Sequence, residues 1–318
     1  MKLAGSRSSE ASFHGRWQEM MRTTQIGWRI SVATILFLLA CDCRAAQRYP
    51  ASGIVLRVNR VAHSIQVSCR EIPEYMPAMV MDLSVRDPKE IVELAAGTMI
   101  DFILAVSDDS AYAESIRVHQ FQSTDQEPMA ARQLNLVSSL VDSTSRETKP
   151  LSVGQRVPDF SLISQKHEPI KLSQFAGKVV AITFLYSHCP LPNFCFRLSN
   201  NFSIVQRRFT DRMGRDLVLL SITFDPEHDQ PEVLSHYAGN WKAADTKGWY
   251  FLTGPLQEIQ KVTLEFGMSF WQDEGLITHA LHTVILDRRG YMVANLEGNE
   301  FTGQQLGDLL ESVLRGPT

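Results

Sequence analysis

The hydrophobic pattern of the chain changes period once, and this change constrains the fold more than any other feature. In residues 50–121 apolar and polar side chains alternate in the period of strands, in short runs separated by turn residues. From residue 153 onward, strand-like apolar runs alternate with helical patterns. The first pattern predicts a small all-β barrel, and the second predicts an α/β domain whose sheet is covered by helices on both faces.

The expected elements follow from these runs. Barrel strands are expected at 53–58, 64–68, 79–85, 99–106 and 113–118. In the second domain, strands are expected at 179–186, 217–224 and 249–252, with a hairpin of 282–287 and 291–296, and helices at 194–212, 230–239, 255–266 and 302–315. The predicted organisation is therefore a leading segment at 1–46, a barrel at 50–121, a polar linker at 122–152 and an α/β domain at 153–318.

Composition bounds the class of protein. The 318 residues are 44% hydrophobic and 21% charged, which is typical of a folded protein long enough for two compact domains. The formal net charge of -4 gives no basic surface for a polyanion. Nucleic acid is therefore excluded as the expected partner.

The N-terminal segment carries a targeting signal. Arg22 and Arg29 precede an apolar run at 30–40, which is shorter than the about 20 residues of a membrane span but has the size of a signal-peptide core. The sequence Leu-Leu-Ala-Cys that ends at Cys41 resembles a bacterial lipobox, so Cys41 is expected to be a lipid anchor. Cleavage after 43–45 with simple secretion is the alternative. Both predict the bacterial cell envelope, with the anchored form on the periplasmic side of the inner membrane.

Two cysteines carry the chemistry. Cys189 and Cys195 directly follow the apolar run at 179–186, which places both thiols at the carboxyl edge of a sheet, where α/β folds present their active groups. A helix that begins near Phe194 is expected to favour the thiolate through its dipole. Soft thiolates with an imidazole, such as that of His279, suit copper, and the two thiols can also cycle as a disulfide. A purely structural disulfide is the remaining alternative.

The second domain resembles the Sco/SenC family of thioredoxin-fold proteins. The resemblance rests on the phrases at 154–160, 177–186 and 221–229, of which the last, ending Asp-Pro-Glu-His-Asp, is the most distinctive. His279 lies eight residues before Asp287, which is the family's spacing from its ligand histidine to the hairpin aspartate. The resemblance implies that Cys189, Cys195 and His279 bind copper, as Cu(I) or Cu(II), with an open position for its transfer.

The thiol loop departs from the family pattern. The usual motif has three residues between the cysteines and a proline after the second, whereas here five residues intervene and Phe196 follows. Pro190 and Pro192 each fix a backbone angle and are expected to keep the two sulfurs convergent. Of the nearby polar residues, His188 is expected to add positive charge, with a role as metal ligand as the alternative, and Asp225 is expected to cap the turn after its strand.

A second metal site is expected in the barrel. The phrase Pro-Ala-Met-Val-Met within 72–81 resembles CusF-like periplasmic copper-binding domains, which are five-stranded barrels of the OB type, and the likeness spans about 51–119. It implies that Met79 and Met81, on one face of a strand, bind Cu(I), with Cys69 close to the position of the family's histidine. Met76 replaces the tryptophan that covers the metal. The alternative is that the methionines only fill the barrel core.

The expected function is that of an envelope copper chaperone. The barrel captures or relays Cu(I), and the thioredoxin-like domain delivers it, by family resemblance, to the copper centre of cytochrome c oxidase subunit II. On this interpretation the protein is not an enzyme. The alternative is a thiol:disulfide oxidoreductase that reduces copper-ligand cysteines of a partner, with Cys189 as nucleophile and Cys195 as resolving thiol. A copper store or sensor is the third possibility.

Overall fold

The computed structural model describes residues 46–107, 110–119, 150–241, 247–268, 270–273, 276–279 and 281–316. The chain divides into two units between Ala46 and Gln47, and the described part belongs almost entirely to the second unit, Gln47–Thr318. The predicted signal run, the lipobox cysteine Cys41 and the linker up to residue 149 lie outside the described residues. Among the residues that are described, no helix is both long and apolar enough to span a bilayer.

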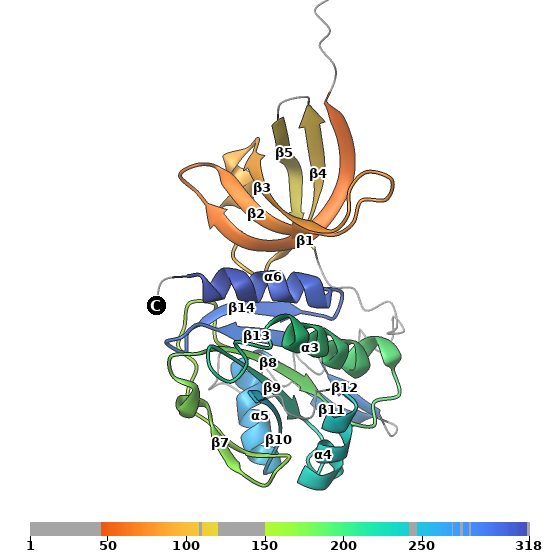
Figure 1. The fold of residues 1–318 in the computed structure, drawn as a ribbon, viewed down its shortest axis with the longest axis vertical. Helices are drawn as coiled ribbons and strands as arrows, with labels where there is room; N and C mark the ends of the chain where they lie inside the picture. Colours follow the sequence, from red (N-terminus) through yellow and green to blue (C-terminus); the bar gives the residue numbers. More distant parts are fainter. Residues whose placement is uncertain are drawn as a thin grey trace, which may run out of the picture. The chain divides into compact units, whose positions relative to one another are not determined.

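The first part of the second unit is a closed five-stranded barrel (Figure 1). Its strands, in the spatial order β1-β2-β3-β5-β4, are β1 (Gln47–Asn59), β2 (Ser64–Cys69), β3 (Met79–Val85), β4 (Met99–Ser107) and β5 (Ser110–Val118). Gly53 is needed where β1 crosses β2, because a Cβ atom there would lie 2.6 Å from the carbonyl oxygen of Ser68. The barrel that the strand-period alternation predicts is confirmed.

The second part is a seven-stranded sheet with helices on its faces. The strand order is β14-β13-β8-β9-β10-β6-β7, with β6 (Ser161–Ser164), β7 (Pro169–Lys171), β8 (Val179–Leu185), β9 (Leu217–Thr223), β10 (Trp249–Thr253), β13 (His282–Leu286) and β14 (Met292–Glu297). Strands β8, β9 and β10 run parallel, and every residue of β8 and β9 is buried, as expected for strands covered on both faces. The α/β fold class is confirmed.

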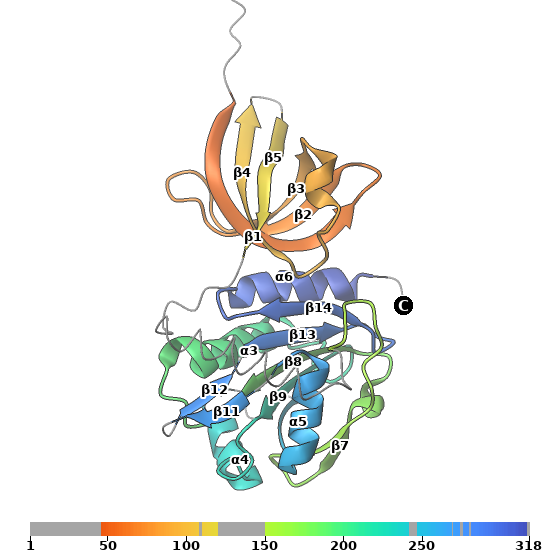
Figure 2. The same cartoon turned by 180° about the vertical axis from the view of Figure 1, so that it is seen from behind.

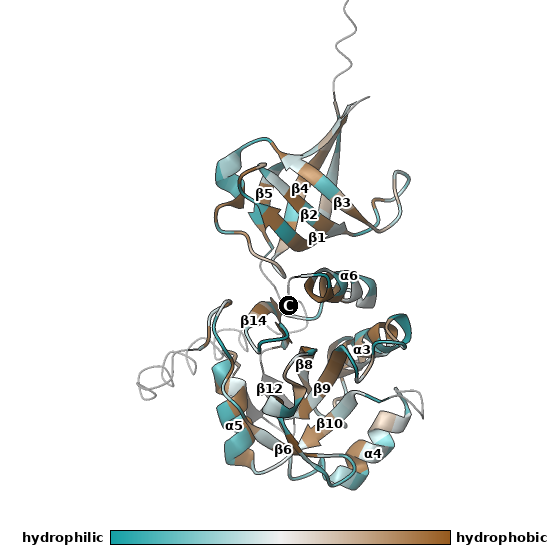
Figure 3. Cartoon of the chain, turned by 60° about the vertical axis from the view of Figure 1, so that its left-hand side comes forward, coloured by the Kyte–Doolittle hydropathy of each residue, from teal (hydrophilic) through white to brown (hydrophobic). Residues whose placement is uncertain are grey.

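The helices of this domain are α3 (Arg197–Arg208), α4 (Pro231–Gly239), α5 (Leu256–Glu265) and α6 (Gly303–Leu314). Figures 2 and 3 show α5 on one side of the sheet and α3 on the other, with apolar strands between them. The sequence places α6 accurately because Thr302 caps it: the backbone N–H of Gln305 donates to the Thr302 hydroxyl at 3.2 Å. Short helical turns occur at η1 (Pro88–Ile91), η2 (Leu172–Phe175) and η3 (Pro192–Phe196).

The helix predicted at 194–212 is shorter than expected. Phe194 has φ −107° and ψ −105°, which lie outside the helical region, so the π-type turn η3 precedes a regular helix that begins only at Arg197. The prediction that a helix begins near Phe194 is therefore wrong by one turn, and the thiols lie before that helix. The hairpin of β11 (Phe270–Asp273) and β12 (Leu276–His279) was not predicted.

The centre of strand β1, at residues 53–56, is buried on both faces. Val55 points into the barrel core, while Ile54 and Leu56 belong to the hydrophobic core that contains the α/β domain. Polar contacts continue this packing, since the Ser68 hydroxyl donates to the carboxylate of Asp308 on α6 at 2.7 Å. The apolar run Ile-Val-Leu at the centre of β1, which breaks strict alternation, is explained by this double burial.

Candidate metal centre

The two thiols of the α/β domain lie where the sequence places them, at the carboxyl end of β8. Cys189 lies in the turn after that strand and is half-buried, while Cys195 lies in η3 and is 1% exposed. Both are free thiols. Each thiol shifts the pKa of the other through a side-chain hydrogen-bond interaction, which requires the two side chains to lie close together although five residues separate them.

This hydrogen bond makes the two thiols chemically different. It lowers the pKa of Cys189 to about 6, because the thiol of Cys195 donates to the Cys189 thiolate, and this outweighs the opposing effect of burial. The same contact raises the pKa of Cys195, and burial raises it further. At neutral pH the pair is therefore one accessible thiolate beside one buried, protonated thiol.

The third expected ligand, His279, ends β12, where its backbone pairs with Phe270 in the two-stranded sheet. Its side chain lies outside what the structure describes, so the distance from the imidazole to the sulfurs stays a prediction. His282, three residues later, is buried in β13, and its Nδ1 atom lies 2.9 Å from Oδ1 of Asn295. Burial lowers the pKa of His282, which makes it a neutral core histidine.

The barrel brings its three expected ligands to one face of one strand pair. Cys69 at the end of β2 is directly opposite Met79 at the start of β3, and Met81 follows two residues later. Directly paired residues of antiparallel strands point to the same face, as do residues two apart. Met79 is 45% exposed whereas Leu83, further along that face, is fully buried, so Met79 lies at an open end of the barrel and Cys69, which is buried, lies just inside it.

Cys69 has a different environment from Cys189. It is 1% exposed, and burial raises its pKa to about 12. Its thiol donates weakly to the carbonyl oxygen of Val67 at 3.9 Å. A metal at this position must therefore displace a firmly held proton. Met76, expected in place of a covering aromatic ring, is partly buried against the barrel core.

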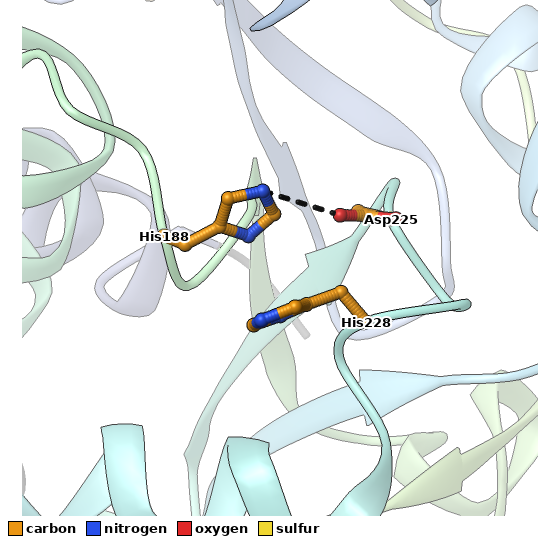
Figure 4. Close-up of side chains that lie close together, drawn as sticks. All are labelled: His188, Asp225 and His228. Atoms are coloured by element: carbon orange, nitrogen blue, oxygen red, sulfur yellow. Dashed lines mark ion pairs between the residues drawn. The ribbon is translucent and has the colours of Figure 1, made fainter. Parts of the chain in front are cut away.

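One cluster of possible ligands was not predicted. His188, Asp225 and His228 each offer a ligand atom, and these atoms all lie within 4.8 Å of one another (Figure 4). The sequence favoured a charge role over a ligand role for His188 and a capping role for Asp225, and it gave no role to His228. The signal that identifies the cluster is the parallel pairing of β8 with β9, which brings the residues after each strand to the same edge.

Comparison with protein families agrees with both resemblances. The SCO1/SenC family model matches residues 149–315, which is more than half of the chain. A second model, described as copper binding periplasmic protein CusF, matches residues 48–117. The predicted family resemblance and the predicted ion, copper, are confirmed at this level, and the CusF description agrees with the predicted cell envelope.

Two curated relatives are each less than 30% identical to this chain. The SCO2-like protein of Rickettsia typhi is 28% identical over 140 residues, covering 41% of this chain and 64% of that protein. The SCO1 protein homolog of Bacillus subtilis is 26% identical over 110 residues, covering 34% of this chain and 55% of that protein. The chain thus spans less than two thirds of the length of these relatives.

Solved structures with a similar fold include a SCO1/SenC family lipoprotein from Bacillus anthracis. It is 23% identical, with a TM-score of 0.46, and the alignment covers 52% of this chain and 97% of that one. Arabidopsis thaliana ScoI with copper bound is 21% identical, with a TM-score of 0.44, covering 51% of this chain and 98% of that one.

Proposed function

Because this chain belongs to the SCO1/SenC family, we propose that it is a copper chaperone in which Cys189, Cys195 and His279 bind the ion. The pair of free thiols at the carboxyl end of β8, with Cys189 half-buried and Cys195 buried, is the observation that supports this most strongly. Two sulfurs that already converge provide a soft bidentate site for Cu(I), and the imidazole adds a ligand compatible with Cu(II). Binding releases the proton of Cys195, so affinity falls as the pH is lowered.

The barrel is proposed as a second Cu(I) site with Cys69, Met79 and Met81 as ligands. The strand register that pairs Cys69 with Met79 supports this proposal. Thioether sulfur selects Cu(I) over harder ions. The barrel then captures or relays the ion, and the thiol domain delivers it.

The proposed destination is the copper centre of cytochrome c oxidase subunit II, on the periplasmic side of the inner membrane. In this organisation the segment 1–46 contains a signal and the lipid anchor Cys41, and the linker 122–152 joins the barrel to the domain 153–318. Exposed apolar side chains beside the thiols support docking of a partner protein. Leu191, which directly precedes η3, is 40% exposed, and Phe196, the last residue of η3, is 59% exposed.

A second candidate function is that of a thiol:disulfide oxidoreductase, and the asymmetry of the thiols favours it. The Cys189 thiolate attacks a disulfide of the partner, forms a mixed disulfide and releases one partner thiolate, which takes up a proton. Cys195 loses its proton and attacks Cys189, which releases the second partner thiol. The partner disulfide gains two electrons, and the chain keeps a Cys189–Cys195 disulfide.

The two functions are separated by titrating the reduced full chain with Cu(I) against a competing chelator. The chaperone proposal predicts two copper ions per chain and the loss of one in His279→Ala, with disulfide reduction retained. His236→Ala, at an exposed position of α4, is the matched control and keeps both ions. An unaltered chain that binds no copper but turns over mixed disulfides leaves only the reductase.

A further inference from the structure

The carboxyl ends of β8 and β9 place three metal-ligand side chains together. The two strands are parallel neighbours, paired up to Leu185 and Thr223. His188 lies in the turn after β8, and Asp225 and His228 lie in the turn after β9. Figure 4 shows the two rings and the carboxylate gathered there. Within the described residues this is the one such group of three histidine, cysteine or acidic side chains.

The separations fit a shared ion better than a hydrogen bond. Nε2 of His188 lies 3.6 Å from Oδ2 of Asp225, which is too long for a hydrogen bond. The rings of His188 and His228 have centroids 4.2 Å apart. Donors bound at 2.0–2.2 Å in a tetrahedral shell lie about 3.4 Å from one another. Small side-chain rotations therefore bring all three donors to one ion.

A buried carboxylate supports His228 from behind. Asp229 is fully buried, and it accepts hydrogen bonds from the backbone N–H of Ser187 at 3.0 Å and from the hydroxyl of Thr223 at 2.5 Å. Its Oδ1 atom also lies 3.2 Å from Nδ1 of His228. With the proton on Nδ1, the lone pair of Nε2 is free to bind a metal, which is the carboxylate–histidine–metal arrangement of many metal sites.

Asp225 adds negative charge at the same point. Its side chain is 10% exposed, and within the described residues its ion-pair partner is His188, at the long distance given above. A nearly buried carboxylate with so loose a partner carries a desolvation cost that a bound cation offsets. The cluster thus combines two imidazoles, the carboxylate of Asp225 and the buried carboxylate of Asp229, which orients the His228 ring.

We propose that His188, Asp225 and His228 form a binding site for a divalent ion of the copper or zinc class, separate from the sulfur sites. Imidazole and carboxylate ligands suit Cu(II) and Zn(II), and Cu(II) binds such ligands most strongly in the divalent series. The proposed site shares no ligand with the centre of Cys189, Cys195 and His279. It therefore stands or fails independently of the proposed chaperone function.

The test uses a full chain in which all five cysteines are changed to serine and His279 to alanine, which removes the sulfur centre and the thiols that would reduce Cu(II). This chain is titrated with Cu(II) alone and followed by electron paramagnetic resonance. One tightly bound ion per chain with coupling to two imidazole nitrogens is expected. His228→Gln and His188→Gln are each expected to weaken binding about 100-fold, while His236→Gln leaves it unchanged. Binding that is equal in His228→Gln and its parent overturns the proposal.

A second arm avoids the buried cysteine changes in case they prevent folding. The otherwise unaltered reduced chain is titrated with Zn(II), which has no redox chemistry. The His228→Gln protein is expected to bind one zinc ion fewer per chain than the unaltered protein, and the Cys189→Ser protein is expected to keep that ion. If instead Cys189→Ser removes all bound zinc, or His228→Gln removes none, the site does not exist. Circular dichroism of each variant checks that the fold is kept.

Discussion

Replacing Cys195 by alanine should raise the pKa of Cys189 toward its ordinary value of 9.0, because the thiol of Cys195 is the main cause of the value of about 6. A thiol with a pKa near 6 is about 90% ionised at pH 7, and one with a pKa near 9 is about 1% ionised. Nucleophilicity acts in the opposite direction, since thiolate reactivity rises with pKa with a Brønsted slope of about 0.4–0.5. For a pKa difference of about 3 units, the higher reactivity of the thiolate compensates roughly 20-fold for its smaller population. The alkylation rate at pH 7 therefore falls only about fourfold.

The discriminating readout is therefore the midpoint of the pH–rate profile and not the rate at one pH. Metal-free protein is alkylated with iodoacetamide between pH 4.5 and 10, and modification of Cys189 is followed by peptide mass spectrometry. The expected midpoint lies near pH 6 in the unaltered chain and moves by up to about 3 pH units in Cys195→Ala. Cys69→Ala removes a thiol that is equally buried but lies in the barrel, so it should leave the midpoint unchanged. A midpoint that stays near pH 6 in Cys195→Ala refutes the reasoning.

Three further predictions concern the folded chain. The hydrogen bond to Asp101 raises the pKa of His119, whose Nε2 atom also lies 2.7 Å from Oε2 of Glu300. The contribution of His119 to the free energy of unfolding is therefore full below about pH 6.5 and is lost as the pH rises through the folded pKa. The stability of His119→Gln in urea should differ from that of the unaltered chain most at pH 6, and an equal difference at pH 6 and 9 contradicts this. Met81→Ala should lose one Cu(I) equivalent in a chelator competition, whereas retention of both ions assigns Met81 to the barrel core alone. Phe202→Ala, at a side chain 1% exposed, should lower the free energy of unfolding in urea by about 3–5 kcal/mol; a loss below about 1 kcal/mol would show that the site is not tightly packed.

The core of the fold was predictable because burial leaves a local pattern. The apolar run at 179–186 gives β8 within one residue, since every residue of Val179–Leu185 is buried. Strand β1, expected from residue 53, begins at Gln47. Its first residues pair with β4 far along the chain, and a long-range pairing of this kind has no local signature.

The two thiols of the candidate site were predictable from their position after a buried strand, but their asymmetry was not. It depends on a hydrogen bond between Cys189 and Cys195 and on the near-complete burial of one of them. The cluster of His188 and His228 was not predictable from the sequence for a related reason. The two residues are 40 positions apart, and only the parallel register of β8 and β9 brings them together.

The central claim is that two sulfurs and one imidazole of the α/β domain hold copper, and copper stoichiometry in a chain with only that site tests it most directly. Met79→Ala removes the proposed barrel site, so reduced Met79→Ala protein should bind one Cu(I) per chain under a competing chelator. Addition of Cys189→Ser should abolish this binding, and addition of His279→Ala should weaken it markedly. One copper ion held equally tightly by all three chains would contradict the account.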